Sequence, residues 1–257
     1  MPMKNFLIIL CLSISLCYIS SDVHSEEYQL LHNKQIDWSF NGMTGFFNRK
    51  SIRRGFQVYQ EVCATCHSMN KIAFRNLEDI GFSAEEIKKL AYTYQVKDGP
   101  NDIGEMFERP GMPTDYFLPP FESQESAAFN NNGVIPPDLS LIIKARHDGA
   151  NYIFSLLTGY INDEQDENGL YFNAYFPTAR LAMAPPLYDG IIEYHPGKKK
   201  PTVENMAYDV VNFLQWAAEP ELELRHKLGF KVLSYCIILT LLFFITNYKI
   251  WNKLYQK

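Results

Sequence analysis

Residues 63–67 carry the sequence Cys63-Ala64-Thr65-Cys66-His67. This C-x-x-C-H pattern is typical of the covalent attachment of a c-type haem. On a helix, the two cysteines and the histidine fall at positions i, i+3 and i+4 and therefore share one face. The two thiols can then add to the two vinyl groups of one porphyrin, while the imidazole points at the iron. The pattern predicts one haem c, held through two thioethers at Cys63 and Cys66, with His67 as an iron ligand.

Three other kinds of site use the same residue types. A thioredoxin-like motif needs a βαβ setting, and strand signals are weak throughout this sequence. A zinc site needs a second pair of ligands, but only Cys236 remains once the export signal described below is removed. A structural disulfide between Cys63 and Cys66 is feasible in an oxidising compartment, but it leaves His67 without a role. The haem interpretation is therefore favoured over all three.

The second axial ligand is less clear from the pattern. A methionine sulfur on the iron is typical of electron-transfer haems and raises their potential. Met183 lies in the loop RLAMAPPL and Met112 in the loop GMP, and the prolines stiffen both loops. Met69 is too close to His67 to reach the opposite face of the haem, and Met206 falls on the apolar stripe of a predicted helix. The pattern therefore favours Met183 and leaves Met112 as an alternative.

The composition is that of an ordinary folded protein. The chain has 257 residues, of which 47% are apolar and 21% charged, which excludes a disordered chain, a collagen and a disulfide-dense mini-protein. Residues 26–220 carry a net charge of −9, whereas residues 221–257 carry +4. An acidic body is poorly suited to bind nucleic acid, because such binding requires Lys and Arg side chains that neutralise phosphates. We expect no nucleic-acid partner and favour a basic protein partner instead.

Two apolar stretches lie at the ends of the chain. Residues 1–25 predict a signal peptide, because the apolar run at 6–19 is too short to span a bilayer. Residues 228–248 form a second run of 21 residues with one charge, about 30 Å long as a helix and thus long enough to cross a membrane. We therefore expect an exported domain at 26–220, a linker at 221–227 and a transmembrane helix at 228–248. A short tail at 249–257 would remain on the inner side.

The body is predicted to be mainly helical. A helix capped by Ser51 is expected to run through Cys66, and a capping box at Ser83 and Glu86 begins another. Further helices are expected at the ranges 136–146, 151–157 and 205–217. The long stretches between them, 98–137 and 159–202, contain more loop than a compact domain normally carries, and a large bound cofactor could hold these loops in place.

Several segments resemble the cytochrome c1 family, in the order in which that family has them. They follow the haem motif and cover nearly all of residues 40–250: 131–140 (NNGVIPPDLS), 145–149 (ARHDG), 152–160 (YIFSLLTGY), 171–177 (YFNAYFP), 183–187 (MAPPL) and 213–220 (FLQWAAEP). The resemblance implies a mainly α fold: a c-type cytochrome haem domain with long loop insertions, plus one C-terminal transmembrane helix.

The same resemblance implies roles for individual residues. It assigns Met183 rather than Met112 as the distal ligand, so that His67 and Met183 become the two metal ligands. It implies that Arg146 contacts a haem propionate and that Tyr152 is a second propionate contact. It also implies that a proline carbonyl at Pro136 or Pro137 accepts a hydrogen bond from the proximal imidazole. An extra cysteine pair near the haem, found in some bacterial members, has no counterpart here.

The function implied by the resemblance is electron transfer within quinol–cytochrome c reductase, the cytochrome bc1 complex. Electrons would arrive singly from a Rieske iron–sulfur protein and leave to a cytochrome c. The expected partners are cytochrome b and the Rieske protein, in a dimeric complex of the bacterial inner membrane with the haem domain on the periplasmic side. This chain alone would make and break no substrate bonds. The alternatives are a membrane-anchored c-type cytochrome of another respiratory complex, a haem enzyme with an open iron site, or a thiol oxidoreductase.

Overall fold

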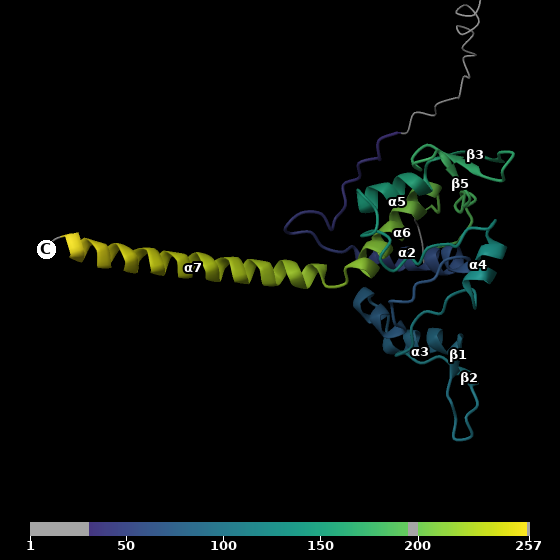
Figure 1. Ribbon diagram of the computed structural model, residues 1–257, viewed down its shortest axis with the longest axis horizontal. Helices are drawn as coiled ribbons and strands as arrows, with labels where there is room; N and C mark the ends of the chain where they lie inside the picture. The colour runs from purple at the N-terminus through teal and green to yellow at the C-terminus, as the bar shows by residue number, and fades with distance from the viewer. Residues whose placement is uncertain (1–30, 195–199, 256–257) are drawn as a thin grey trace, which may run out of the picture.

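The computed structural model describes residues 31–194 and 200–255 (Figure 1). The predicted signal peptide therefore lies outside the described residues. In chain order the elements are α2 (Arg49–Glu61), η1 (Cys63–Thr65), η2 (Phe74–Ile80), α3 (Ala84–Tyr92), β1 (Gln95–Asp98), β2 (Phe107–Pro110), α4 (Gln124–Asn130), α5 (Gly149–Leu157), β3 (Tyr160–Gln165), β4 (Tyr171–Asn173), β5 (Arg180–Leu181), α6 (Val203–Ala218) and α7 (Leu222–Tyr255). The mainly helical fold predicted from the sequence is confirmed.

The centre of the body is the contact between α2 and α6. Gly55 lies where the two helices cross, so close that a methyl group in its place would overlap the carbonyl oxygen of Asp209 and lie 2.9 Å from the Cβ of Phe213. Around this point aromatic rings fill the core. Phe56 and Phe213 meet edge to face with ring centroids 5.5 Å apart. Such close packing of two helices gives the interior its density and determines how the rest of the chain wraps around it.

A buried ion pair reinforces this crossing. The Arg54 guanidinium donates to both carboxylate oxygens of Asp209, each at 2.8 Å, and the Asp209 side chain has no exposed surface. The Ser51 hydroxyl donates to the same carboxylate at 2.6 Å. A buried carboxylate is tolerated when a bidentate arginine and further hydrogen bonds compensate for its lost hydration. Residues 51, 54 and 55 thus form one face of α2, and this face recognises α6.

The start and end of α2 differ from the prediction. The helix begins at Arg49 because Asn48 caps it, accepting from the Ser51 amide at 3.2 Å; the Ser51 side chain is engaged with Asp209 instead. The α-helix also stops at Glu61 rather than running through Cys66. The chain then tightens into the 3₁₀ turn η1, in which the Cys66 and His67 amides donate to the Cys63 carbonyl at 3.2 and 2.9 Å. Ser51 as the cap, and a continuous α-helix to Cys66, were wrong.

The helix expected from 136 to 146 does not form. The Asp138 carboxylate accepts from the Ser140 amide at 2.9 Å, but it also accepts from the Ser68 hydroxyl and the Asn70 amide, which hold it against the segment after His67. Residues 141–148 follow as irregular turns. By contrast, the capping box of Ser83 and Glu86 is confirmed at the start of α3. The predicted helices at 151–157 and 205–217 are confirmed as α5 and α6, with small shifts of their ends.

Two small antiparallel sheets order part of the long loop stretches. β1 pairs antiparallel with β2, from Gln95 opposite Pro110 to Asp98 opposite Phe107. β3, β4 and β5 form a second antiparallel sheet. Figure 1 shows the two sheets on opposite sides of the helical body, with the β1–β2 hairpin projecting away from it. These hairpins satisfy backbone groups locally, in regions where the sequence carries only weak strand signals.

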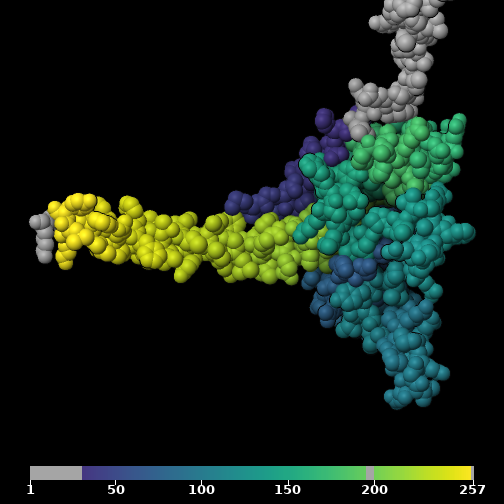
Figure 2. Space-filling model, in the orientation of Figure 1, coloured from purple at the N-terminus to yellow at the C-terminus, as the bar shows by residue number. Residues whose placement is uncertain are grey.

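α7 leaves the body as a single exposed rod, as Figures 1 and 2 show. Among the described residues it is the one helix long and apolar enough to span a membrane, with a mean hydropathy of 2.2 over its most apolar 18 residues. The predicted linker at 221–227 is helical from Leu222. Glu223 accepts from the Phe47 amide at 2.7 Å and pairs with Arg49 at 2.8 Å. The base of α7 is therefore fastened to the body.

We expect Gly55→Ala to lower the free energy of unfolding by about 1–3 kcal/mol, because the added methyl forces α2 away from α6. The measurement is denaturant unfolding of the full-length chain in detergent. Gly229→Ala is the control, since a Cβ at Gly229 meets no other atom within 4 Å. Equal stability of the two variants would contradict the proposed tight crossing.

Candidate haem site

Cys63, Cys66 and His67 lie together just beyond the end of α2. The turn η1 brings Cys66 and His67 back over the Cys63 carbonyl, so the three side chains occupy one short turn. Both thiols are free and partly buried. The packing of α2 against α6 thus determines where this turn lies relative to the core.

The His67 imidazole is oriented by one hydrogen bond. Its Nδ1 lies 2.8 Å from the carbonyl oxygen of Pro137, a group that can only accept, so Nδ1 carries the proton. Burial lowers the pKa of His67, opposed by the Pro137 carbonyl and the negative charge of Asp138. The ring is therefore neutral at neutral pH. Within residues 31–194 and 200–255 the ring has no second hydrogen bond, which leaves the Nε2 lone pair for a metal.

Two of the alternatives to a haem are disfavoured, a thiol oxidoreductase and a zinc site. Burial, assisted by the neighbouring Cys66, raises the pKa of the Cys63 thiol to about 12. A redox-active cysteine needs the opposite, a lowered pKa that yields thiolate near neutral pH. In the part of the chain that the structure describes, no cluster of three or more His, Cys, Asp or Glu side chains could hold a bare metal ion. The donor set, two neighbouring thiols and one free imidazole nitrogen, fits a covalently attached haem.

Met183 lies in the extended loop that follows β5. The Tyr160 hydroxyl donates to the Met183 carbonyl at 3.0 Å, and burial raises the pKa of Tyr160, so this phenol remains a donor. Tyr160, at the start of β3, is a residue that the sequence pattern did not single out. Among the described residues no hydrogen bond joins the Met183 loop to His67.

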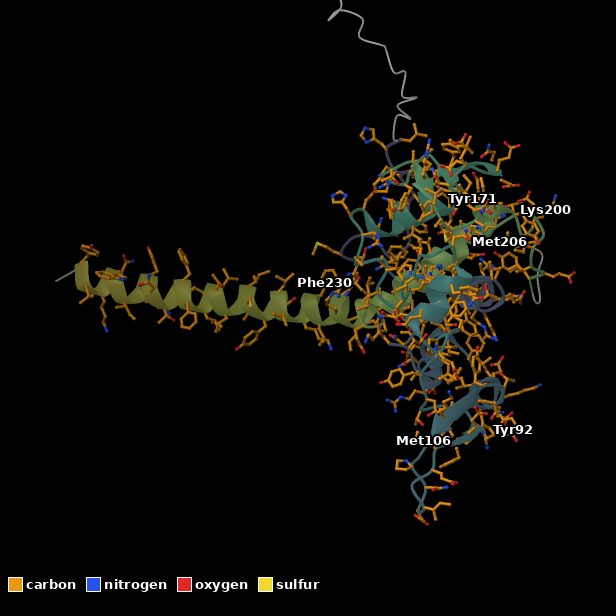
Figure 3. The ribbon with its side chains drawn as sticks, turned by 45° about the vertical axis from the view of Figure 1, so that its right-hand side comes forward. Tyr92, Met106, Tyr171, Lys200, Met206 and Phe230 are labelled. Carbon is orange, nitrogen blue, oxygen red and sulfur yellow. The ribbon has the colours of Figure 1, made fainter. Side chains whose placement is uncertain are left out.

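The other methionines occupy different settings. Met69 and Met206 have no exposed surface and belong to the core. The Met112 side chain is 46% exposed, and its amide donates to Asp115 at 2.7 Å. Met43 and Met106 are about two-thirds exposed. Figure 3 shows Met106 on the projecting hairpin and Met206 within the body.

Arg146 and Tyr152 lie near one another. Arg146 is exposed, and its guanidinium donates to the Ala145 carbonyl at 3.1 Å. Tyr152, on α5, is half-buried against the core. Burial raises the pKa of Tyr152, and the positive charge of Arg146 opposes this increase. The pair offers a cation and a neutral hydroxyl, a combination suited to carboxylate recognition.

Comparisons with known proteins identify the family of this chain. Residues 38–254 match the model of the Cytochrome C1 family. The chain belongs to the cytochrome c1 family. It is 45% identical to cytochrome c1 of Rhodospirillum rubrum over 235 residues, covering 84% of this chain and 86% of that protein. It is also 46% identical to "Cytochrome c1, heme protein, mitochondrial" of Schizosaccharomyces pombe, covering 82% of this chain and 70% of that protein.

A third relative is named for its complex. The chain is 44% identical to the "Cytochrome b-c1 complex catalytic subunit, mitochondrial" of Candida albicans, covering 88% of this chain and 77% of that protein. The family match includes the motif at Cys63, His67 and the loop of Met183, as well as most of α7. The mainly helical body with one long apolar C-terminal helix is thus the architecture of a cytochrome c1.

We expect Tyr160→Phe to lower the free energy of unfolding by about 1–2 kcal/mol, because the Met183 carbonyl loses its donor. Hydrogen exchange of the 181–187 segment should become faster in the same variant. Tyr188→Phe is the control, since Tyr188 is 62% exposed. If the two variants behave alike, Tyr160 does not hold this loop.

Proposed function

We propose that this chain is the haem-carrying electron-transfer subunit of a cytochrome bc1 complex. It would take electrons one at a time from a Rieske iron–sulfur protein and pass them to a cytochrome c. The observation that carries the proposal is the His67 ring, which donates from Nδ1 to the Pro137 carbonyl and keeps Nε2 free beside two unpaired thiols. The name of the Candida albicans relative supports the choice of complex.

Each site residue has a role in this proposal. Cys63 and Cys66 would bind one haem c through thioethers, and His67 and Met183 would supply the two protein ligands of its iron. Bound haem c supplies a one-electron ferric/ferrous couple. Two protein ligands would leave no open coordination position, so that little has to reorganise on electron transfer and oxygen binding is disfavoured. Arg146 and Tyr152 would contact the haem propionates, the guanidinium by charge and the phenol by its hydroxyl proton.

The proposed location follows from the two ends of the chain. An export signal at 1–25 would deliver the body to the periplasmic side of a bacterial inner membrane. Helix α7, exposed along its most apolar stretch, would then cross that membrane once and leave residues 249–257 inside. The ties of Glu223 to Phe47 and Arg49 support a body held at a constant position above the bilayer. Cytochrome b, the Rieske protein and a second copy of the complex would complete the assembly.

One experiment tests covalent haem attachment directly. An alkaline pyridine spectrum of the purified protein, with a haem stain on a denaturing gel, reports thioether linkage and stoichiometry together. We expect one haem per chain, retained on the gel and lost when both Cys63 and Cys66 are replaced by Ala. Co-purification with cytochrome b and a Rieske protein then separates this assignment from a c-type cytochrome of another respiratory complex. A protein without covalent haem would overturn the proposal.

We expect Met183→Leu to lower the reduction potential by more than about 100 mV, because a thioether ligand favours the ferrous iron. The reduced variant should also bind carbon monoxide, since one axial position is then open. Redox titration followed by visible absorption measures the potential. Met112→Leu is the matched control and should leave both properties unchanged. The opposite result, with the shift in Met112→Leu, would assign the distal ligand to Met112.

We expect the acidic hairpin of β3 and β4 to accelerate the reaction with a basic cytochrome c. Asp163, Glu164 and Glu167 are exposed there, and complementary charge mainly raises the association rate. Raising the ionic strength shortens the Debye length from about 30 Å at 0.01 M to about 8 Å at 0.15 M, so the oxidation rate in stopped flow should fall.

Charge removal should reproduce this effect only at the docking site. The triple variant Asp163→Asn, Glu164→Gln, Glu167→Gln should slow the reaction at low salt. The control carries Asp102→Asn, Glu105→Gln and Glu108→Gln, three exposed residues in and around the β1–β2 hairpin. Equal rates in the two triple variants would contradict docking at the β3–β4 hairpin.

A further inference from the structure

The segment that follows His67 is joined to the loop that carries Pro137 by a ladder of hydrogen bonds. The Leu139 amide donates to the Ser68 carbonyl at 2.9 Å. The Lys71 amide donates to the hydroxyl of Ser140, a residue with no exposed surface, at 3.1 Å. The bond from His67 to Pro137 is one end of this ladder. Its geometry therefore depends on how firmly the remaining bonds hold residues 68–71 against residues 138–140.

Asp138 contributes most of these bonds. Its Oδ2 accepts from the Ser68 hydroxyl at 2.8 Å and from the Asn70 amide at 2.9 Å. Its Oδ1 accepts from the Ser140 amide at 2.9 Å. One carboxylate thus binds three donors, two from the segment after His67 and one from its own loop. An amide side chain has a single acceptor oxygen and cannot replace both carboxylate oxygens.

The position of Asp138 in the sequence makes these bonds relevant to the imidazole. Asp138 directly follows Pro137, whose carbonyl accepts the ring proton, and Ser68 directly follows His67, which donates it. The carboxylate therefore connects the neighbours of both partners in that bond. A small displacement at either neighbour would lengthen or rotate the ring contact, because neighbouring residues share a peptide plane.

We propose that Asp138 is a positioning residue for the proximal ligand: by clamping Ser68, Asn70 and Ser140 it sets the direction and strength of the His67 hydrogen bond to Pro137, and so tunes the potential of the haem iron. This inference rests on the proposed function, in which His67 ligates the iron. A ring N–H donated to a carbonyl makes the opposite nitrogen a stronger donor to the metal and favours ferric iron. Loosening the clamp therefore raises the reduction potential.

The test compares variants of the haem-loaded full-length protein by redox titration. Asp138→Asn removes the charge and one acceptor, whereas Asp138→Glu keeps the charge but moves the carboxylate. Asp166→Asn is the matched control, because Asp166 also accepts from two backbone amides, those of Asn168 and Leu170, in another loop. Both Asp138 variants are expected to raise the potential relative to wild type, and by more than Asp166→Asn does.

A second readout reports the clamp itself. Nuclear magnetic resonance of the reduced protein follows the His67 Nδ1 proton, whose chemical shift depends on its hydrogen bond. We expect this resonance to move upfield in both Asp138 variants and to stay in place in Asp166→Asn. Ser68→Ala removes the hydrogen bond from the Ser68 hydroxyl to Asp138 and keeps the carboxylate. We expect it to change the potential and the resonance in the same direction as the Asp138 variants, but by less. It also serves as the test if an Asp138 variant does not fold.

Two results would overturn the inference. One is a potential that rises in Asp138→Asn but not in Asp138→Glu or Ser68→Ala, which would mean that only the charge matters. The other is an unmoved Nδ1 resonance in every variant that folds. Failure of the proposed function is distinguishable from both, because wild-type protein would then contain no covalent haem and give no potential at all.

Discussion

The close crossing of α2 and α6 at Gly55 is the constraint on which the remaining structure depends. Only a residue without a side chain fits against the Asp209 backbone there, and the buried Arg54–Asp209 pair sets the register of the two helices. α2 ends a few residues later at the turn of Cys63, Cys66 and His67. The position of this turn is therefore determined by a contact between two helices in the core.

Two loops position individual functional groups of the candidate site. The loop from Pro137 to Ser140 has no helix of its own and is joined to residues 67–71 by hydrogen bonds. The loop of Met183 is held from β3 by Tyr160. Irregular segments of this kind can present a carbonyl or a sulfur at a chosen place, because their backbone groups are not used in regular secondary structure.

The acidic body and the basic, apolar end of the chain are kept apart in space. Figure 2 shows helix α7 leaving the body as an exposed rod. Glu223, at its base, contacts Arg49 and the Phe47 amide. A tie of this kind limits the orientations that the body can take above a membrane. The exposed acidic β3–β4 hairpin lies on a different part of the body (Figure 1). Charge steering and membrane anchoring can therefore act without interfering with each other.

The C-x-x-C-H spacing, the membrane-length apolar run and the capping box of Ser83 with Glu86 could be predicted from the sequence, because each depends on residues within a few turns of one another. Two features depend on residues about 70 positions apart: the choice of Pro137 over Pro136 as the acceptor of the His67 proton, and the hydrogen bonds of Asp138 to the segment after His67. Ser51 is a similar case. Its hydroxyl donates to Asp209, 158 positions away in the sequence, so Asn48 caps helix α2 instead. The sequence favours a helix at 136–146, but the Asp138 carboxylate accepts instead from the distant donors Ser68 and Asn70. Only the tertiary structure determines which hydrogen-bond partner such a side chain takes, because a buried polar group binds the partner that packing places beside it.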